Sequence, residues 1–99
     1  MYVIFLKFGP NRAQVAQWST AHKQWIQAGI DDGIFLAAGS LEDAQGGAII
    51  ATGVDKRALV ARVTQDPFVA HGVVTAEVHA IAPSVMSSGF AELLSSNKP

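Results

Sequence analysis

The alternation of short apolar runs with glycine- and proline-rich breaks is the feature that most constrains the fold of this chain. Residues 2–8 form a β-branched and aromatic run that stops at Gly9-Pro10. A short apolar run bounded by such a break is typical of a buried strand. The same reasoning predicts further strands over residues 34–41, 48–52 and 72–81.

Two stretches between the predicted strands carry the three- and four-residue spacing of amphipathic helices. The first is predicted to begin near Arg12, because Asn11 and Gln14 occupy the positions of a capping box. Its apolar stripe consists of Val15, Trp18, Trp25, Ile26 and Gly29. The second helix follows Asp55, a predicted N-cap. It stops before Pro67, because the residue before a proline is pushed out of the helical region.

The order strand, helix, strand, strand, helix, strand predicts an α+β fold. It is the ferredoxin-like βαββαβ arrangement, with a four-stranded antiparallel sheet and both helices on one face. Alternation along the last strand turns Thr75, Glu77, His79 and Ile81 toward the uncovered face. Such a mixed set suits a partner sheet or a lined cavity better than bulk water, so we expect a homodimer.

The composition indicates one small domain with more apolar residues than its core can bury. The chain has 99 residues, of which 49% are hydrophobic and 15% charged, which suggests an oligomer interface. The net charge of −1 and the scattered basic residues argue against nucleic acid as a partner. The opening apolar run is cut by Lys7 and no run reaches the ~18–20 apolar residues of a membrane span, so a cytoplasmic location is expected. Cysteine is absent, which excludes disulfides and thiolate chemistry.

The chain continues beyond the natural end of this fold. We therefore divide it into a domain over residues 1–82 and a C-terminal extension over residues 83–99. The extension is predicted to hold a short helix with Phe90, Leu93 and Leu94 on one face. This apolar face is expected to dock, and docking on a neighbouring subunit would build a higher oligomer.

An ionisable ring, His22, interrupts the apolar stripe of the first helix. The two helices of this topology run side by side, so His22 and Asp66 fall toward the same edge of the sheet. If they meet, they form a His–carboxylate pair in a half-buried site, a common arrangement for moving protons. Asp66 would hold the ring in one tautomer and leave its other nitrogen free for a substrate.

Simpler interpretations of the same residues stay open. A lone histidine on an apolar face is more often a hydrogen-bonded core residue. Asp66 before Pro67 is also a good N-cap for a short turn. A metal site built from His22, Asp66, His71 and His79 is not favoured, because the histidines lack paired ligand spacing, and we expect no metal or other cofactor.

Several short motifs together are more specific than any of them alone. They are the apolar opening strand, His22 followed by Trp25, Gly33, Gly39-Ser40-Leu41, and Asp66-Pro67-Phe68 followed by Gly72. In their order and spacing the chain resembles the YCII-related domain proteins over roughly residues 1–82. The resemblance implies a ferredoxin-like domain that dimerises into an α+β barrel, with an active site at His22 and Asp66. Some members or close relatives are lyases or isomerases of small aromatic breakdown products.

The leading hypothesis is a cofactor-free enzyme of lyase or isomerase type acting on a small organic acid or lactone. His22 would be the general acid/base, and Asp66 would orient it and stabilise its charged form. Further candidate contacts to the substrate are Ser40, Trp25 and His79, although Trp25 also suits plain packing.

Two other functions remain as alternatives. The first is a non-catalytic dimeric module for ligand binding or scaffolding, in which the bond between His22 and Asp66 is structural. The second is a haem- or oxygen-dependent member of the wider dimeric barrel group, for which His79 and Glu77 on the open face are the available groups.

Overall fold

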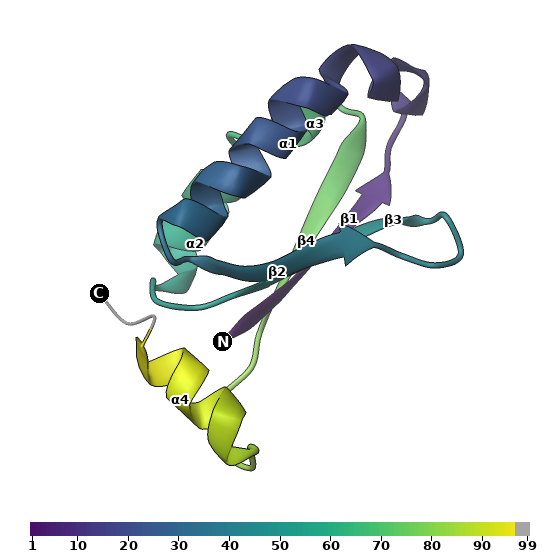
Figure 1. The fold of residues 1–99 in the computed structure, drawn as a ribbon. Helices are drawn as coiled ribbons and strands as arrows, with labels where there is room; N and C mark the ends of the chain where they lie inside the picture. The colour runs from purple at the N-terminus through teal and green to yellow at the C-terminus, as the bar shows by residue number, and fades with distance from the viewer. Residues whose placement is uncertain (97–99) are drawn as a thin grey trace.

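The structure, a computed structural model, describes residues 1–96 and has the predicted α+β fold. Its strands are β1 (Tyr2–Phe8), β2 (Phe35–Ser40), β3 (Gly46–Ala51) and β4 (Val74–Ala80). Its α-helices are α1 (Val15–Asp31), α2 (Lys56–Val63), α3 (Pro67–Ala70) and α4 (Ser88–Ser96). The strands pair antiparallel in the order β2-β3-β1-β4, and α1, α2 and α3 cover one face (Figure 1). This strand order is that of a ferredoxin-like domain.

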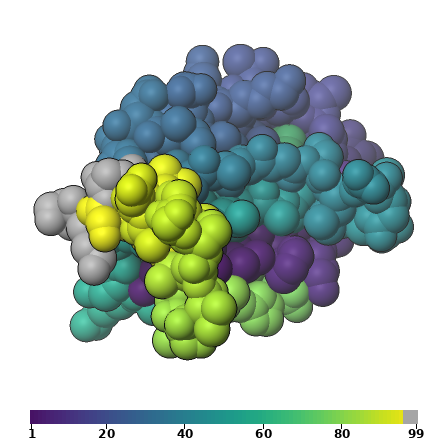
Figure 2. All heavy atoms as spheres, turned by 60° about the horizontal axis from the view of Figure 1, so that its bottom comes forward, coloured from purple at the N-terminus to yellow at the C-terminus, as the bar shows by residue number. Residues whose placement is uncertain are grey.

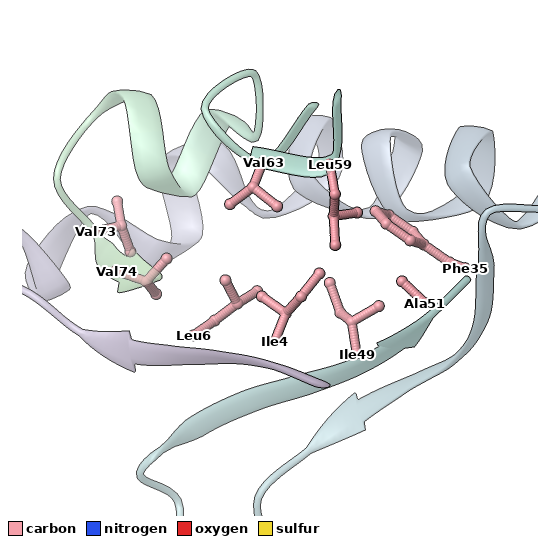
Figure 3. Packing of buried hydrophobic residues seen from close by; sticks show 9 residues of the cluster. All are labelled: Ile4, Leu6, Phe35, Ile49, Ala51, Leu59, Val63, Val73 and Val74. Carbon is pink, nitrogen blue, oxygen red and sulfur yellow. The ribbon is translucent and has the colours of Figure 1, made fainter. Parts of the chain in front are cut away.

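The core lies between the sheet and this helical layer (Figure 3). It consists of Ile4, Leu6, Phe35, Ile49, Ala51, Leu59, Val63, Val73 and Val74. Side chains along each strand point alternately toward the helices and away from them. Ile4 pairs with Ile49 on one side and with Val78 on the other, so all three side chains face the helices. Each large apolar side chain buried here contributes about 1.5–3 kcal/mol.

Helix α1 comes close to the sheet at Gly29, its buried residue. A Cβ at Gly29 would lie 2.1 Å from Cδ2 of Phe35, so the phenyl ring packs directly on the helix backbone. Trp25, one turn earlier, meets the same ring edge-on at 5.0 Å between centroids. The C-terminal half of α1 is thus packed tightly against the sheet.

The predicted capping box at the first helix is wrong. Residues Arg12–Gln14 form a 3-10 turn before α1, and Asn11 makes no side-chain capping bond. Nδ2 of Asn11 donates to the carbonyl oxygen of His71 at 2.8 Å, which ties this turn to the end of α3. The amide of Gln14, which a capping box would pair with the Asn11 side chain, donates to the backbone carbonyl of Asn11 at 2.9 Å.

The β2–β3 hairpin is tighter than predicted, because β3 begins at Gly46 rather than at Ala48. The amide of Leu41 donates to the carbonyl of Gly46 at 2.8 Å. Gly46 has φ +130°, and a Cβ there would lie 1.9 Å from the carbonyl oxygen of Leu6. Only glycine fits this close approach. Gly46, which the predicted strand bounds left in the loop, therefore belongs to the sheet.

The other face of the sheet is uncovered by helices, as predicted (Figure 1). Thr75, Glu77, His79 and Ile81 are all exposed there. Nζ of Lys7 lies 3.0 Å from Oε2 of Glu77 on this face. Dimerisation through it stays a prediction.

The predicted short helix of the C-terminal extension is present as α4. Figures 1 and 2 show it at the end of the sheet where the chain begins. Phe90 and Leu94 are partly buried, whereas Leu93 is 42% exposed. Residues 97–99 of the predicted extension lie outside the described residues. Within the described part of the chain, no helix is both long and apolar enough to span a membrane.

Candidate functional site

His22 and Asp66 meet in the structure. Nδ1 of His22 lies 2.7 Å from Oδ1 of Asp66, within hydrogen-bond distance. The Asp66 side chain is fully buried and that of His22 is 17% exposed. With an ionised Asp66, Nδ1 is the donor, which fixes the tautomer of the neutral ring. The hydrogen bonds of residues 1–96 leave Nε2 of His22 without a partner.

Asp66 also performs the local role that the sequence suggested. It is the N-cap of α3, with Pro67 at the first helical position, and its Oδ1 accepts from the amide of Phe68 at 3.0 Å. One oxygen therefore caps a helical turn and holds the histidine. The two interpretations of Asp66 describe the same atom and do not compete.

The same turn fixes the plane of the imidazole. The ring of Phe68 stacks on that of His22, with 4.1 Å between centroids and 9° between planes. Phe68 takes its position from the cap that Asp66 forms. The histidine is thus held by a hydrogen bond at its edge and by an aromatic ring on its face.

The second carboxylate oxygen of Asp66 is buried without a hydrogen bond. Within the described chain, Oδ2 is the buried side-chain oxygen or nitrogen that has no partner. Burying a carboxylate oxygen without a hydrogen bond lowers the stability of the fold. The interaction of Asp66 with His22 offsets part of this cost.

His22 forms part of the wall of a pocket of about 570 Å³, a volume suited to a small organic molecule. Figure 1 shows α1 and the β2–β3 hairpin diverging toward the tip of the hairpin, and both contribute to the lining. The space exists because the hairpin carries small residues here. These are Ala38, Gly39, Ser40, Gly46, Gly47 and Ala48.

The pocket lining includes one further residue that was predicted for the site from the sequence, and several that were not predicted. Ser40 lines the same pocket as His22. Ser19, Lys23 and Gln27 of α1 line it as well. Ser19 stands three residues before His22 on the same face of the helix, so the helical spacing could have found it. Lys23 and Gln27 stand one and five residues after His22 and point to another side of the helix, so the spacing gives no signal for them.

Two other predicted contacts lie elsewhere. Trp25 is not in the pocket lining; its Nε1 donates to the carbonyl of Arg62 at 3.1 Å and so joins α1 to the end of α2. His79 lies on the opposite face of the sheet, 57% exposed, with Nε2 3.9 Å from Oε2 of Glu77. Neither side chain reaches the pocket that His22 lines.

The histidines are spread over three separate places in the fold. His71 stacks on the half-buried Trp18 at 3.6 Å between centroids, and it lies apart from His79 on the open face. Among residues 1–96 no three His, Cys, Asp or Glu side chains gather in a way that could hold a metal ion.

Fold and site together define a ferredoxin-like α+β domain with a buried His–carboxylate pair at the wall of a pocket. The sequence matches the family model of the YCII-related domain over residues 1–81, so the chain belongs to that family. No curated protein matches the chain.

Proposed function

We propose that this protein is an enzyme that moves a proton on a small organic molecule, with His22 as general acid/base. The observation that supports this most strongly is Nε2 of His22, which has no partner among the described residues and belongs to a ring that lines the pocket. Buried polar atoms nearly always pair with the protein or with ordered water, so a ring nitrogen without a protein partner beside a pocket favours a role toward a ligand.

The bond to Asp66 suits this task. A neutral ring that donates from Nδ1 presents a lone pair at Nε2, which accepts a proton from an acidic C–H of the substrate. The carboxylate then stabilises the resulting imidazolium. Nε2 returns the proton to another carbon of the substrate in an isomerisation, or gives it to a leaving group that departs with its bonding electrons in an elimination. A positioned base of this kind contributes about 10²–10⁴-fold in rate. The net reaction is an isomerisation or an elimination, which suits an organic acid or a lactone.

The rest of the pocket supports the same chemistry. The walls include Leu6, Phe8, Ile49 and Val74, so a substrate would leave bulk water behind. A low-polarity environment strengthens the interaction of Asp66 with the charged ring. Ser40 is proposed as a hydrogen-bond donor to the substrate.

We further propose that the uncovered sheet face joins two copies of the chain into a homodimer. Support comes from Ile81, a large apolar side chain that is 41% exposed on this face. Sedimentation of wild type and Ile81→Glu tests it. A dimer that the substitution weakens is expected, and a monomeric wild type contradicts it.

The second candidate is a non-catalytic module in which the pair is purely structural. The capping bond from the amide of Phe68 to Asp66 favours it, because this bond gives the carboxylate a role without any substrate. The substitution Asp66→Asn separates the two functions. Asparagine is an equally good N-cap of similar shape, but it carries no charge to stabilise an imidazolium.

A proton-exchange assay tests the proposal without knowledge of the natural substrate. Small carboxylic acids and lactones with an acidic C–H are incubated with enzyme in D₂O, and loss of the C–H signal is followed by proton NMR. We expect wild type to catalyse exchange or isomerisation, and His22→Gln to slow it by at least about 100-fold. His71→Gln is the matched control and should equal wild type. Equal rates for wild type and folded His22→Gln contradict the proposal and favour the structural module.

A further inference from the structure

The pocket that His22 lines has an asymmetric charge. Its described lining contains one side chain with a full charge, that of Lys23, and no carboxylate. Asp66, the nearest acid to the site, is fully buried behind the histidine and is not part of the lining. A ligand in the pocket therefore meets a positive group and no negative one.

Lys23 is free to meet such a ligand. The ion pairs of the described chain involve other basic residues, and Lys23 is in none of them. Its neighbours one turn away on α1, Ser19, Thr20, Ile26 and Gln27, include no acid. The usual helical partner of a lysine is thus missing. Lys23 is an exposed lining residue without an ion-pair partner in the described chain, so its ammonium is available to bind an anion at this pocket.

The other residues of the pocket lining indicate what kind of molecule would fit beside Lys23. Most other side chains of the lining are aliphatic or aromatic, and Phe8, Ile49 and Phe68 are examples. Hydroxyl and amide groups from Ser19 and Gln27 stand near Lys23 along the same helix. An apolar molecule with one anionic end matches this arrangement. Binding a phosphate usually requires several hydrogen-bond donors, whereas a single lysine is a better match for a carboxylate.

We propose that Lys23 is the specificity residue of this site and selects a small carboxylate with an apolar body over neutral molecules of the same shape. This rests on the proposed function, and it narrows the substrate from an acid or lactone to the charged acid. The carboxylate binds to the ammonium of Lys23, and the apolar part fills the pocket beside the imidazole. Because His22 and Lys23 line the same pocket, an acid anchored on Lys23 would present its neighbouring carbons to Nε2.

The test uses benzoate and benzamide as probes, because they have the same shape and differ in charge. Amide shifts of the pocket residues Ser40, Gly46 and Gly47 are followed during titration of wild type, Lys23→Gln and the control Lys56→Gln. We expect wild type and Lys56→Gln to bind benzoate about tenfold more tightly than benzamide. Lys23→Gln should bind both probes equally, with its affinity for benzamide unchanged, and Lys23→Arg should restore the preference. Added salt should weaken binding of benzoate more than that of benzamide.

Other outcomes overturn the proposal. They are equal affinities in wild type, a benzoate preference that survives in Lys23→Gln, shifts that fall outside the pocket, or no binding of benzoate to wild type. Binding is measured on His22→Gln as well, which should keep the benzoate preference. Loss of the benzoate preference in Lys23→Gln therefore tests the role of Lys23 alone. Proton exchange that survives in His22→Gln contradicts the catalytic role of His22 and leaves the selection of anions by Lys23 intact.

Discussion

Nδ1 of His22 and Oδ1 of Asp66 lie 2.7 Å apart although the two residues are 44 positions apart in the chain. The same Oδ1 accepts the amide of Phe68, whose ring stacks on the imidazole. One short turn therefore holds the histidine at its edge and on its face. The contact depends on α1 and α3 packing side by side, so the fold and the site are coupled.

The dual role of Asp66 predicts an unusually large cost for removing it. Asp66→Ala should lower the free energy of unfolding by about 2–4 kcal/mol, because it removes a cap and leaves the imidazole without its buried partner. Asp55→Ala is the matched control, since Asp55 caps α2 from an exposed position through a 2.7 Å bond from the amide of Ala58. That substitution should cost about 0.5–2 kcal/mol. Urea unfolding measures both, and equal losses would contradict a buried pair.

The close packing of α1 on β2 predicts that a single methyl group is not tolerated at Gly29. Gly29→Ala should cost about 1–3 kcal/mol, because the added Cβ meets the ring of Phe35 and the core must shift. Gly89→Ala is the helical control, since a Cβ there meets nothing within 4 Å. It should be neutral or slightly stabilising. Thermal unfolding of the two variants gives the comparison.

Trp25 should prove to be a packing residue. Trp25→Phe removes the hydrogen bond from Nε1 to the carbonyl of Arg62, which should lower stability by about 0.5–1.5 kcal/mol. Trp18→Phe removes an exposed hydrogen bond to Gln14 and keeps a ring that can stack on His71, so it should cost less. Affinity for benzoate should equal that of wild type in both variants. A Trp25→Phe protein with normal stability but weakened binding would assign this residue to the site.

The open face of the sheet carries a pH-dependent ion pair. The hydrogen bond and charge of Lys7 lower the pKa of Glu77 below its usual 4.5, with His79 adding a smaller effect. Because the folded-state pKa is the lower one, the stabilisation is present above the unfolded pKa and is lost as the pH falls through the folded one. Lys7→Gln should raise the pKa of Glu77, as measured by NMR titration of its carboxyl carbon. Lys56→Gln, on the helical side, should leave it unchanged.

Most of the fold could be predicted because its signals are local. Breaks such as Gly9-Pro10 and the cap at Asp55 mark element ends, and the alternation along β4 identifies its two faces. The predicted capping box was wrong because the amide of Gln14 donates to the backbone carbonyl of Asn11, while the Asn11 side chain donates to His71 across the fold. A local pattern cannot show that a distant carbonyl orients this side chain.

The site was predictable only in part. His22 and Asp66 could be singled out, because an ionisable ring on an apolar stripe and an acid before a proline are both unusual. The pocket could not, because it results from small residues on β2 and β3 that leave space under α1. Lys23 was missed for a related reason: it lies beside the stripe, and only the shape of the pocket brings it into the lining.

The central claim is that Asp66 holds the imidazole of His22 so that Nε2 is the proton acceptor in the pocket. Nitrogen NMR of the protein with ¹⁵N-labelled histidine tests this most directly, with His71→Gln and His79→Gln used to assign the signals. In the neutral ring of His22, Nδ1 should carry the hydrogen and Nε2 should give the signal of an unprotonated nitrogen that shifts when benzoate binds. A neutral ring with the hydrogen on Nε2, unaffected by benzoate, would contradict the account.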